Sequence, residues 1–260
     1  MEFTDHFVAV TGAGSGIGRA TALRFAQDGA TVAVVGHSSA NAEEVADQIR
    51  QGGGAADPFA AEVSRPESVA ALFATMAERY PRLDAVVANA GVNGVWAPVD
   101  VLDVDDWQHT IATNLTGSFA TIKYALPLLR AAGGGSVVLT SSINGTRVFA
   151  TPGGMAYGVS KAGQVALAKM CAVELAADRI RVNVVCPGAI DTEIGDNTEQ
   201  RQTDELRARG YSPEGKIPLS ADLPGAAAQV AELICFLSSD RADHISGTEV
   251  WIDGAQSLVG

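Results

Sequence analysis

The sequence predicts an α/β fold, a doubly wound parallel sheet of about seven strands with helices on both faces. Short apolar segments alternate with helix-forming segments along the whole chain, as expected when helices connect parallel strands. Most of these apolar segments are continuous runs, which is typical of strands covered on both faces. The length of 260 residues suits one large domain of this kind. We therefore expect a single domain over residues 1–260.

The individual elements follow from the pattern. The expected strands are residues 7–10, 31–35, 57–60, 85–88, 136–140, 181–185 and 248–252. The expected helices are residues 17–27, 42–51, 65–79, 105–130, 154–176 and 226–237. Asn41 and Glu44 have capping-box spacing before the second helix, and Pro127 is a point where the fourth helix could break.

Residues 189–223 depart from the alternating pattern. They are polar and contain one helix-forming stretch with a weak apolar face, residues 199–209. They follow the end of an expected strand, which is where open α/β sheets bind ligands. We expect them to form a lid that covers a substrate. A plain surface insertion is the alternative.

The charge and the cysteines limit the function classes. Lys and Arg total 18 against 30 Asp and Glu, a net charge of −12, which argues against nucleic acid or an anionic membrane as a partner. The first residues lack the apolar core of a signal peptide, and no apolar run is long enough to span a bilayer. Cys171, Cys186 and Cys235 lie far apart in apolar segments, as expected of reduced thiols in a cytoplasmic protein. The four histidines show no metal-ligand spacing, so we expect no catalytic metal.

A glycine-rich turn follows the first expected strand. Residues 11–18 read TGAGSGIG and lead into the first helix. Such glycines let the backbone turn tightly and let a pyrophosphate approach the free N–H groups of the helix N-terminus. The turn departs from the usual G-x-G-x-x-G because Ile17 stands where the third glycine would be. It predicts a nucleotide site in a Rossmann-like domain, with a glycine turn that binds no ligand as the alternative.

Tyr157 and Lys161 lie four residues apart in a helix-forming segment, so they share a helix face. A free tyrosine has a pKa of about 10 and is a poor acid or base at neutral pH. A nearby ammonium favours the phenolate and lowers this pKa. The spacing therefore indicates a proton-transfer pair, and an exposed helix face is the alternative.

With these features in this order, the chain resembles the short-chain dehydrogenase/reductase superfamily from end to end. The matching residues are Thr11-Gly12-x-x-x-Gly16-x-Gly18, Asn89-Ala90-Gly91, Asn114, Ser141-Ser142, Tyr157-x-x-x-Lys161 and Pro187-Gly188. The resemblance implies hydride transfer between a nicotinamide and a ketone or secondary alcohol. A catalytically silent nucleotide-binding regulator or scaffold of the same fold is one alternative. A methyltransferase with another Rossmann-like sheet is a second, which would leave Tyr157 and Lys161 unexplained.

The resemblance implies four catalytic residues. Tyr157 gives or takes the hydroxyl proton, and Lys161 lowers the pKa of Tyr157 and holds the ribose hydroxyls of the nicotinamide. Ser142 polarises the carbonyl, and a capping serine is its alternative. Asn114 holds a water in a proton relay, a task that would explain an asparagine inside a helix. A buried Asn114 that bonds its own backbone is the alternative.

The resemblance also implies a set of cofactor-binding residues: Gly12, Gly14, Ser15, Gly16, Ile17, Gly18, His37, Ser38, Glu62, Val63, Asn89, Ala90, Gly91, Tyr157, Lys161, Pro187, Gly188, Ile190 and Thr192. An NAD enzyme normally has an acid at the end of the second strand for the ribose 2′-OH, and this chain has none there. Gly36 leaves room for a 2′-phosphate, which His37 and Ser38 could bind. We expect NADP(H) in preference to NAD(H), which stays open because His37 could equally be an exposed loop residue.

The residues expected to face the substrate are mixed and mostly apolar: Trp96, Asn144, Val148, Phe149 and Met155. They predict a neutral, medium-sized ketone or secondary alcohol. The last expected strand resembles the one that commonly packs in homotetramers of the superfamily, and Trp251 on it fits either an interface or the core. We expect a homotetramer, with a homodimer as the alternative.

Overall fold

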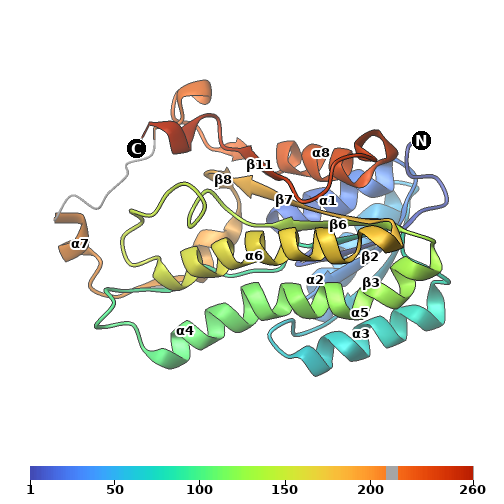
Figure 1. Cartoon of the computed structure of the whole chain (residues 1–260), viewed down its shortest axis with the longest axis horizontal. Helices are drawn as coiled ribbons and strands as arrows, with labels where there is room; N and C mark the ends of the chain where they lie inside the picture. Colours follow the sequence, from blue (N-terminus) through green and yellow to red (C-terminus); the bar gives the residue numbers. More distant parts are fainter. Residues whose placement is uncertain (209–215, 260) are drawn as a thin grey trace.

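In a computed structural model of the protein, which describes residues 1–208 and 216–259, seven parallel strands form the central sheet (Figure 1). Their order is β3-β2-β1-β4-β6-β7-β11. The strands are β1 (Phe7–Thr11), β2 (Thr31–Gly36), β3 (Ala55–Ala60), β4 (Ala85–Ala88), β6 (Gly135–Thr140), β7 (Ile180–Pro187) and β11 (Glu249–Ile252). The expected fold class and all seven expected strands are confirmed, with ends that shift by one or two residues.

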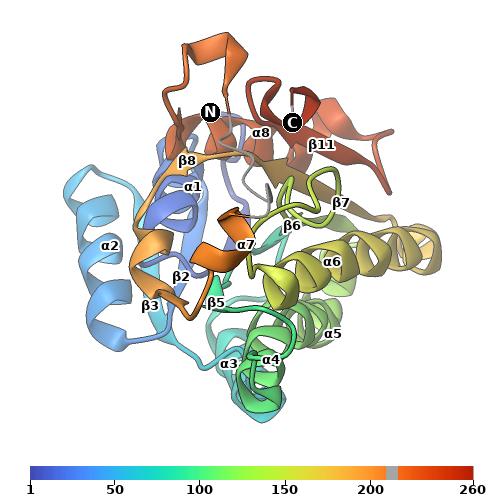
Figure 2. The same cartoon turned by 90° about the vertical axis from the view of Figure 1, so that its left-hand side faces the viewer.

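Helices cover both faces of the sheet (Figure 2). One face carries α1 (Gly16–Gln27), α2 (Ser39–Gln51) and α8 (Ala227–Ser238), and the other carries α3 (Pro66–Arg79), α5 (Gly117–Ala131) and α6 (Met155–Glu174). Alternate residues of one strand enter opposite cores. In β1, for example, Val8 and Val10 pack against the α1 side and Ala9 against the α5 side. This explains why the strands read as continuous apolar runs.

The strand order reverses between β1 and β4, which pair with each other. Chain connections leave this point in opposite directions, so the carboxyl ends of the two strands border a crevice. The crevice lies beyond Thr11 of β1 and Ala88 of β4. The glycine turn and the segment 89–91 start there, which places both beside any ligand of the sheet edge.

The helix expected over residues 105–130 is irregular at a different place from the one predicted. It consists of α4 (Val104–Ile111), a π-helical segment (Ala112–Thr116) and α5, and Pro127 lies inside α5 without ending it. Pro127 and Lys123, whose carbonyl is four residues earlier, are both exposed, so water can satisfy that carbonyl. The irregularity falls instead at the buried Asn114.

Two further predictions about helices need correction. The helix α2 begins at Ser39, three residues early, because the Ser38 hydroxyl caps it by accepting a hydrogen bond from the Asn41 N–H (3.3 Å). The helix expected at 199–209 begins only at α7 (Asp204–Ala208), and residue 209 lies outside the described residues.

The stretch before α7 is extended because β9 (Thr198–Gln200) pairs with β5 (Gly94–Trp96). A second short pair joins β8 (Ile190–Asp191) to β10 (Gly225–Ala226). None of these four strands was predicted, since two or three residues are too few to show a period.

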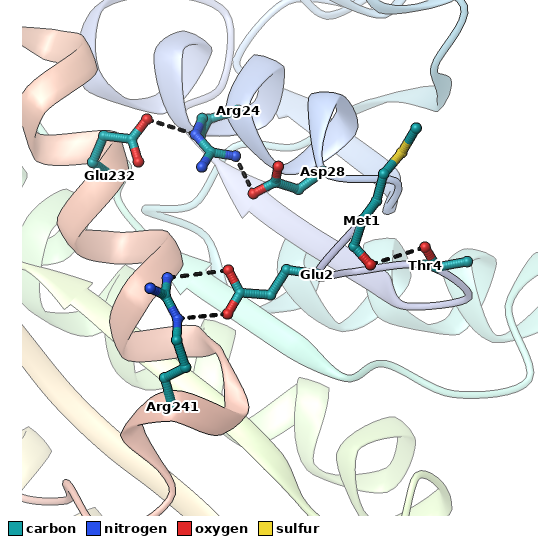
Figure 3. A network of polar contacts seen from close by, with 7 residues as sticks. All are labelled: Met1, Glu2, Thr4, Arg24, Asp28, Glu232 and Arg241. Atoms are coloured by element: carbon teal, nitrogen blue, oxygen red, sulfur yellow. Dashed lines mark hydrogen bonds and ion pairs between the residues drawn. The ribbon is translucent and has the colours of Figure 1, made fainter.

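Polar contacts fix the N-terminal residues against α8 (Figure 3). Arg24 on α1 forms ion pairs with Asp28, the residue that follows this helix, and with Glu232 on α8 (2.6 Å to the latter). Glu2 pairs with Arg241 just after α8 (2.7 Å). Exposed pairs contribute little individually, but together they mark α1 and α8 as neighbours.

Two absences concern the residues that the structure describes. Among residues 1–208 and 216–259, no helix is long and apolar enough to cross a membrane. Across these same ranges, no group of three or more His, Cys, Asp or Glu side chains is arranged to hold a metal ion.

Candidate active site

A cleft of about 930 Å³ opens at the carboxyl edge of the sheet, where the strand order reverses. Its walls come from the glycine turn, the ends of β4, β6 and β7, the start of α6, and the segment 189–194. The predicted site residues that line it are Gly12, Ser15, Gly16, Ile17, Asn89, Ala90, Gly91, Trp96, Ser142, Asn144, Val148, Phe149, Tyr157, Lys161, Pro187, Gly188, Ile190 and Thr192.

Ser142, Tyr157 and Lys161 form a buried cluster on one wall of the cleft. Their exposed fractions are 7%, 8% and 3%. The Ser142 hydroxyl accepts a hydrogen bond from the Asn144 N–H (3.1 Å) and lies beside the Tyr157 phenol, whose pKa it lowers. The Lys161 Nζ donates to the Thr140 carbonyl (2.9 Å) and lies 5.5 Å from the centre of the Tyr157 ring.

The neighbouring Ser141 has a different position, since its hydroxyl donates to the Lys161 carbonyl (2.8 Å). Ser141 therefore ties β6 to α6, while Ser142 is the serine that meets the phenol. The choice of Ser142 over Ser141 stays a prediction.

Burial governs the two ionisable groups of the cluster. It raises the pKa of Tyr157 above its usual value, although the Ser142 hydroxyl acts in the opposite direction. Burial also lowers the pKa of Lys161 to about 8. The direction for Tyr157 is opposite to the one predicted from the Tyr157–Lys161 spacing, because loss of solvation is the largest cause of the shift and Lys161 is not among its causes. At neutral pH, the pair is therefore a phenol beside a mostly protonated amine.

A close backbone contact holds the Ser142 loop against the Tyr157 helix. Gly145 has a left-handed φ of +81°, and a Cβ at this position would lie only 1.9 Å from the carbonyl oxygen of Gly158. Gly158 directly follows Tyr157 in α6. Only a residue without a side chain lets the two segments approach so closely, so Gly145 sets the distance between Ser142 and Tyr157.

Asn114 is fully buried and does not line the cleft. Its amide bonds the N–H and the carbonyl of Val92 (2.8 and 2.9 Å) and the Ser160 hydroxyl (2.9 Å). Its main-chain carbonyl accepts from Ser118 and Gln164 (2.7 and 2.9 Å). The side chain thus bonds other segments rather than its own backbone, and it fixes Val92, in the segment after β4, to Ser160 of α6.

The glycine turn has the shape that a dinucleotide requires. Gly12 and Gly16 have φ of +65° and +49°. A Cβ on Gly18 would lie 2.1 Å from the Gly12 carbonyl oxygen, so Gly18 lets α1 pack directly on the turn. The Asn89 amide donates to the Thr11 carbonyl (3.1 Å) and joins the ends of β4 and β1. The bare backbone at the N-terminus of α1 fits a pyrophosphate.

Eight predicted site residues do not line this cleft: Gly14, Gly18, His37, Ser38, Glu62, Val63, Asn114 and Met155. Gly14 and Gly18 shape the turn from behind, and Val63 is buried. Met155 lines a neighbouring apolar pocket of about 340 Å³, because it starts α6 on the outer side of the helix. His37 and Glu62 lie beyond the second and third strands, where they pair with each other (Nδ1 to Oε2, 3.0 Å).

Several residues that line the cleft carry no sequence signal. Arg147 stacks on the Trp251 ring (3.7 Å from guanidinium carbon to ring centre), and Arg207 bonds Gln200 (3.1 Å). Both guanidinium groups therefore have partners in the chain. The Gln256 side chain accepts from the Ala189 N–H (2.7 Å) and supports the Pro187-Gly188 turn from the C-terminal segment. Such contacts join distant segments, so no local pattern could have revealed them.

Replacing Lys161 with methionine is expected to stabilise the fold. At pH 7 the lysine is charged in the folded and in the unfolded chain, but only the folded chain bears the cost of burying the charge. Because burial lowers the pKa from its usual 10.5 to about 8, the gain should be roughly 1–3 kcal/mol after loss of the Thr140 hydrogen bond. The gain is full below pH 8 and disappears as the pH rises towards 10.5.

Urea unfolding at pH 7 measures this difference, with Lys169→Met as the control. Lys169 lies on the same helix, but it is half-exposed and paired with Glu249, so its loss should bring no gain. A Lys161→Met protein that is less stable than the wild type would contradict the burial argument.

Comparisons with known proteins agree with this geometry. A family model described as enoyl-(acyl carrier protein) reductase matches residues 12–255. A 3β-hydroxysteroid dehydrogenase from Mediterraneibacter gnavus is 35% identical, covering 97% of this chain and 95% of that protein. A cis-4-hydroxycyclohexanecarboxylate dehydrogenase from Sinomonas cyclohexanicum is 38% identical, covering 99% and 98%. The crystal structure of a 3-ketoacyl-ACP reductase from Sinorhizobium meliloti 1021 superposes with a TM-score of 0.92 at 47% identity, covering 98% of this chain and 100% of that one.

Proposed function

This chain belongs to the short-chain dehydrogenase/reductase superfamily, and we propose that Tyr157 is its general acid and base. The protein is an NAD(P)-dependent oxidoreductase that acts on an alcohol or ketone group. The observation that carries the assignment of residues is the buried cluster of Ser142, Tyr157 and Lys161 on the wall of the cleft. A silent scaffold gives no reason to bury an amine and a phenol together there.

The side chains of the cluster move and hold the proton. A bound nicotinamide dinucleotide supplies or accepts the hydride. Ser142, which lies beside the Tyr157 phenol, donates to the substrate oxygen and orients it. Tyr157 protonates that oxygen during reduction and takes the proton back during oxidation. Because burial favours the neutral phenol, the acid that reduction needs is present at neutral pH.

Lys161 and Asn114 support this proton transfer. The Lys161 ammonium, held by the Thr140 carbonyl, stabilises the phenolate that forms when Tyr157 gives up its proton. Lys161 would also hold the ribose hydroxyls of the nicotinamide. Atoms added at Gly91 would meet both the Asn114 Oδ1 (3.1 Å) and the Lys161 Nζ (3.3 Å). We propose that Asn114 positions a water in a proton relay near this amine.

We propose that the protein binds NADP(H) in preference to NAD(H). The glycine turn, with Gly12 and Gly16 at its centre, fits the pyrophosphate of either cofactor. The end of β2 offers no acid for a ribose 2′-OH, while His37 and Ser38 are exposed there. Glu62 already pairs with His37, so the expected preference is small.

The substrate proposal is a neutral, medium-sized ketone or secondary alcohol. Trp96, Val148 and Phe149 give the cleft apolar walls, and Asn144 adds one polar side chain. Relatives named for a 3β-hydroxysteroid and for cyclohexanol support a cyclic, mainly apolar substrate, whereas the relative named for cis-4-hydroxycyclohexanecarboxylate is named for a carboxylate. The expected lid over residues 189–223 would cover it, since Ile190, Thr192 and other residues of this segment line the cleft; residues 209–215 of it lie outside the described residues.

The oligomeric state and the cellular location are also proposed. We propose a homotetramer, with a homodimer as the alternative. Met170 and Val173 on α6 are 73% and 81% exposed, and β11 is an edge strand of the sheet, so both surfaces are available for association. Light scattering on the purified protein distinguishes the two. The unpaired thiols of Cys171, Cys186 and Cys235 suit the cytoplasm.

A fluorescence titration with NADPH and NADH, followed by a screen of ketones and alcohols, tests the proposed function. Binding of at least one cofactor and turnover of neutral cyclic ketones are expected. Binding of neither cofactor would contradict the proposal. Turnover of carboxylates or sugar phosphates alone would contradict the substrate class but not the reaction.

A further inference from the structure

A side-chain contact between a histidine and a glutamate joins the ends of two neighbouring strands at the edge of the sheet. β2 and β3 run in register up to Gly36 and Ala60. His37 follows the first strand directly, and Glu62 lies two residues beyond the second. Their side chains meet with 3.0 Å between Nδ1 and Oε2. In a doubly wound sheet, the end of the second strand is where the ribose 2′ group of a dinucleotide is recognised.

Glu62 is the fixed partner of this pair. Its Oε1 accepts hydrogen bonds from the Ser64 N–H (3.2 Å) and the Ser64 hydroxyl (2.8 Å). Partial burial raises its pKa, but these bonds and the nearby His37 and His109 lower it by more. Glu62 is therefore an anchored carboxylate, whereas the His37 side chain is 82% exposed and can turn.

The two segments that border the expected ribose site contain no basic side chain other than His37. Residues 12–18 and 35–42 contain no lysine or arginine, so His37 is the one side chain of these two segments that can carry a positive charge. A 2′-phosphate would need the positive charge of His37, but Glu62 already binds this side chain. The Glu62 carboxylate would also repel the phosphate. A free 2′-OH, in contrast, can donate to a carboxylate.

We propose that Glu62 is a specificity-determining residue, which limits the preference for NADP(H) by holding His37 and repelling the 2′-phosphate. The acid that NAD enzymes place at the end of the second strand is here supplied from the third. This inference rests on the proposed function, because it presumes that a nicotinamide dinucleotide binds at the glycine turn.

Glu62→Gln tests the inference with little change of shape. The amide oxygen keeps both bonds from Ser64, and the carboxylate charge is removed. We expect the dissociation constant of NADPH, measured by fluorescence titration, to fall on the order of tenfold. The constant for NADH should stay the same or rise.

Glu67→Gln is the matched control. Glu67 lies nearby on α3 and loses the same charge, but its partner is Arg65 (3.0 Å) and its side chain is 69% exposed. The ratio of the NADPH and NADH constants should therefore stay within about twofold of the wild type. If both variants shift the ratio equally, net charge is the cause and the inference is wrong.

A double-mutant cycle with His37→Ala tests whether Glu62 weakens NADPH binding by holding His37. In the wild type, where Glu62 holds His37, this substitution should change the NADPH constant by less than about threefold. In the Glu62→Gln background it should remove most of the gain. His37 is exposed, so the variant should fold.

The outcomes separate the inference from the proposed function. A wild-type protein that binds neither cofactor would contradict the proposed function. A wild type that binds, with a Glu62→Gln variant whose ratio is unchanged, would contradict the inference alone. If Glu62→Gln unfolds, as thermal melting would show, Glu62→Ala carries the same expectation for NADPH, and an unchanged ratio there overturns the inference.

Discussion

Replacing Tyr157 with phenylalanine is expected to lower the turnover number by about 10³-fold, because it removes the proton donor and leaves the aromatic ring in place. The ring of Tyr157 is buried on α6, and phenylalanine fills the same space. The dissociation constant of the cofactor, measured by fluorescence titration, should therefore change by less than about threefold.

Tyr80→Phe is the control for loss of a phenol elsewhere. The Tyr80 hydroxyl donates to Asp57 (2.8 Å), far from the cleft wall, and serves only the fold. Its loss should cost about 1 kcal/mol of unfolding free energy and leave turnover intact. A Tyr157→Phe protein that keeps most of its turnover would show that another group moves the proton.

Replacing Gly145 with alanine is expected to damage stability and turnover together. The added Cβ would lie 1.9 Å from the Gly158 carbonyl oxygen and 2.9 Å from the Gly158 Cα. Both are backbone atoms of α6, so the loop or the helix must move. We expect a loss of roughly 3 kcal/mol or more of unfolding free energy. Turnover should fall as well, because Ser142 moves away from Tyr157.

Gly53→Ala separates the clash from the backbone strain. Gly53 has a φ of +84°, close to the +81° of Gly145, but a Cβ there meets nothing within 4 Å. Its replacement should cost only the left-handed conformation, about 1–2 kcal/mol, with normal turnover. Urea unfolding and steady-state kinetics measure both variants. Equal losses would mean that the Gly145–Gly158 contact does not hold the site together.

The sequence predicted those parts of the fold that depend on local pattern. The strands were found because each is a continuous apolar run, and the glycine turn because its residues are adjacent. Tyr157 and Lys161 were found through their helical spacing, and the structure places both on the cleft wall with Ser142. The superfamily was predicted from the order of the motifs, and the comparisons confirm it.

What the sequence did not predict depends on contacts between distant segments. The pKa of Tyr157 depends on how completely its surroundings exclude water, which a four-residue spacing does not reveal. The partner of His37 lies 25 positions along the chain, at Glu62. The Gln256 contact with Ala189 joins residues 67 positions apart. These features arise only when the sheet brings strand ends together.

The π-helical segment before α5 makes the position of Asn114 depend on residue number. A π-helical turn is equivalent to an α-helix with one inserted residue. Deleting a residue from Ala112–Thr116 would therefore restore a regular helix with α4 and α5 still in phase, but it would close the widened turn in which Asn114 lies. Asn114 could then no longer face Val92 and Ser160 together. The widened turn thus depends on one extra residue, and single-residue deletions should be tolerated far less in this segment than substitutions on its exposed side.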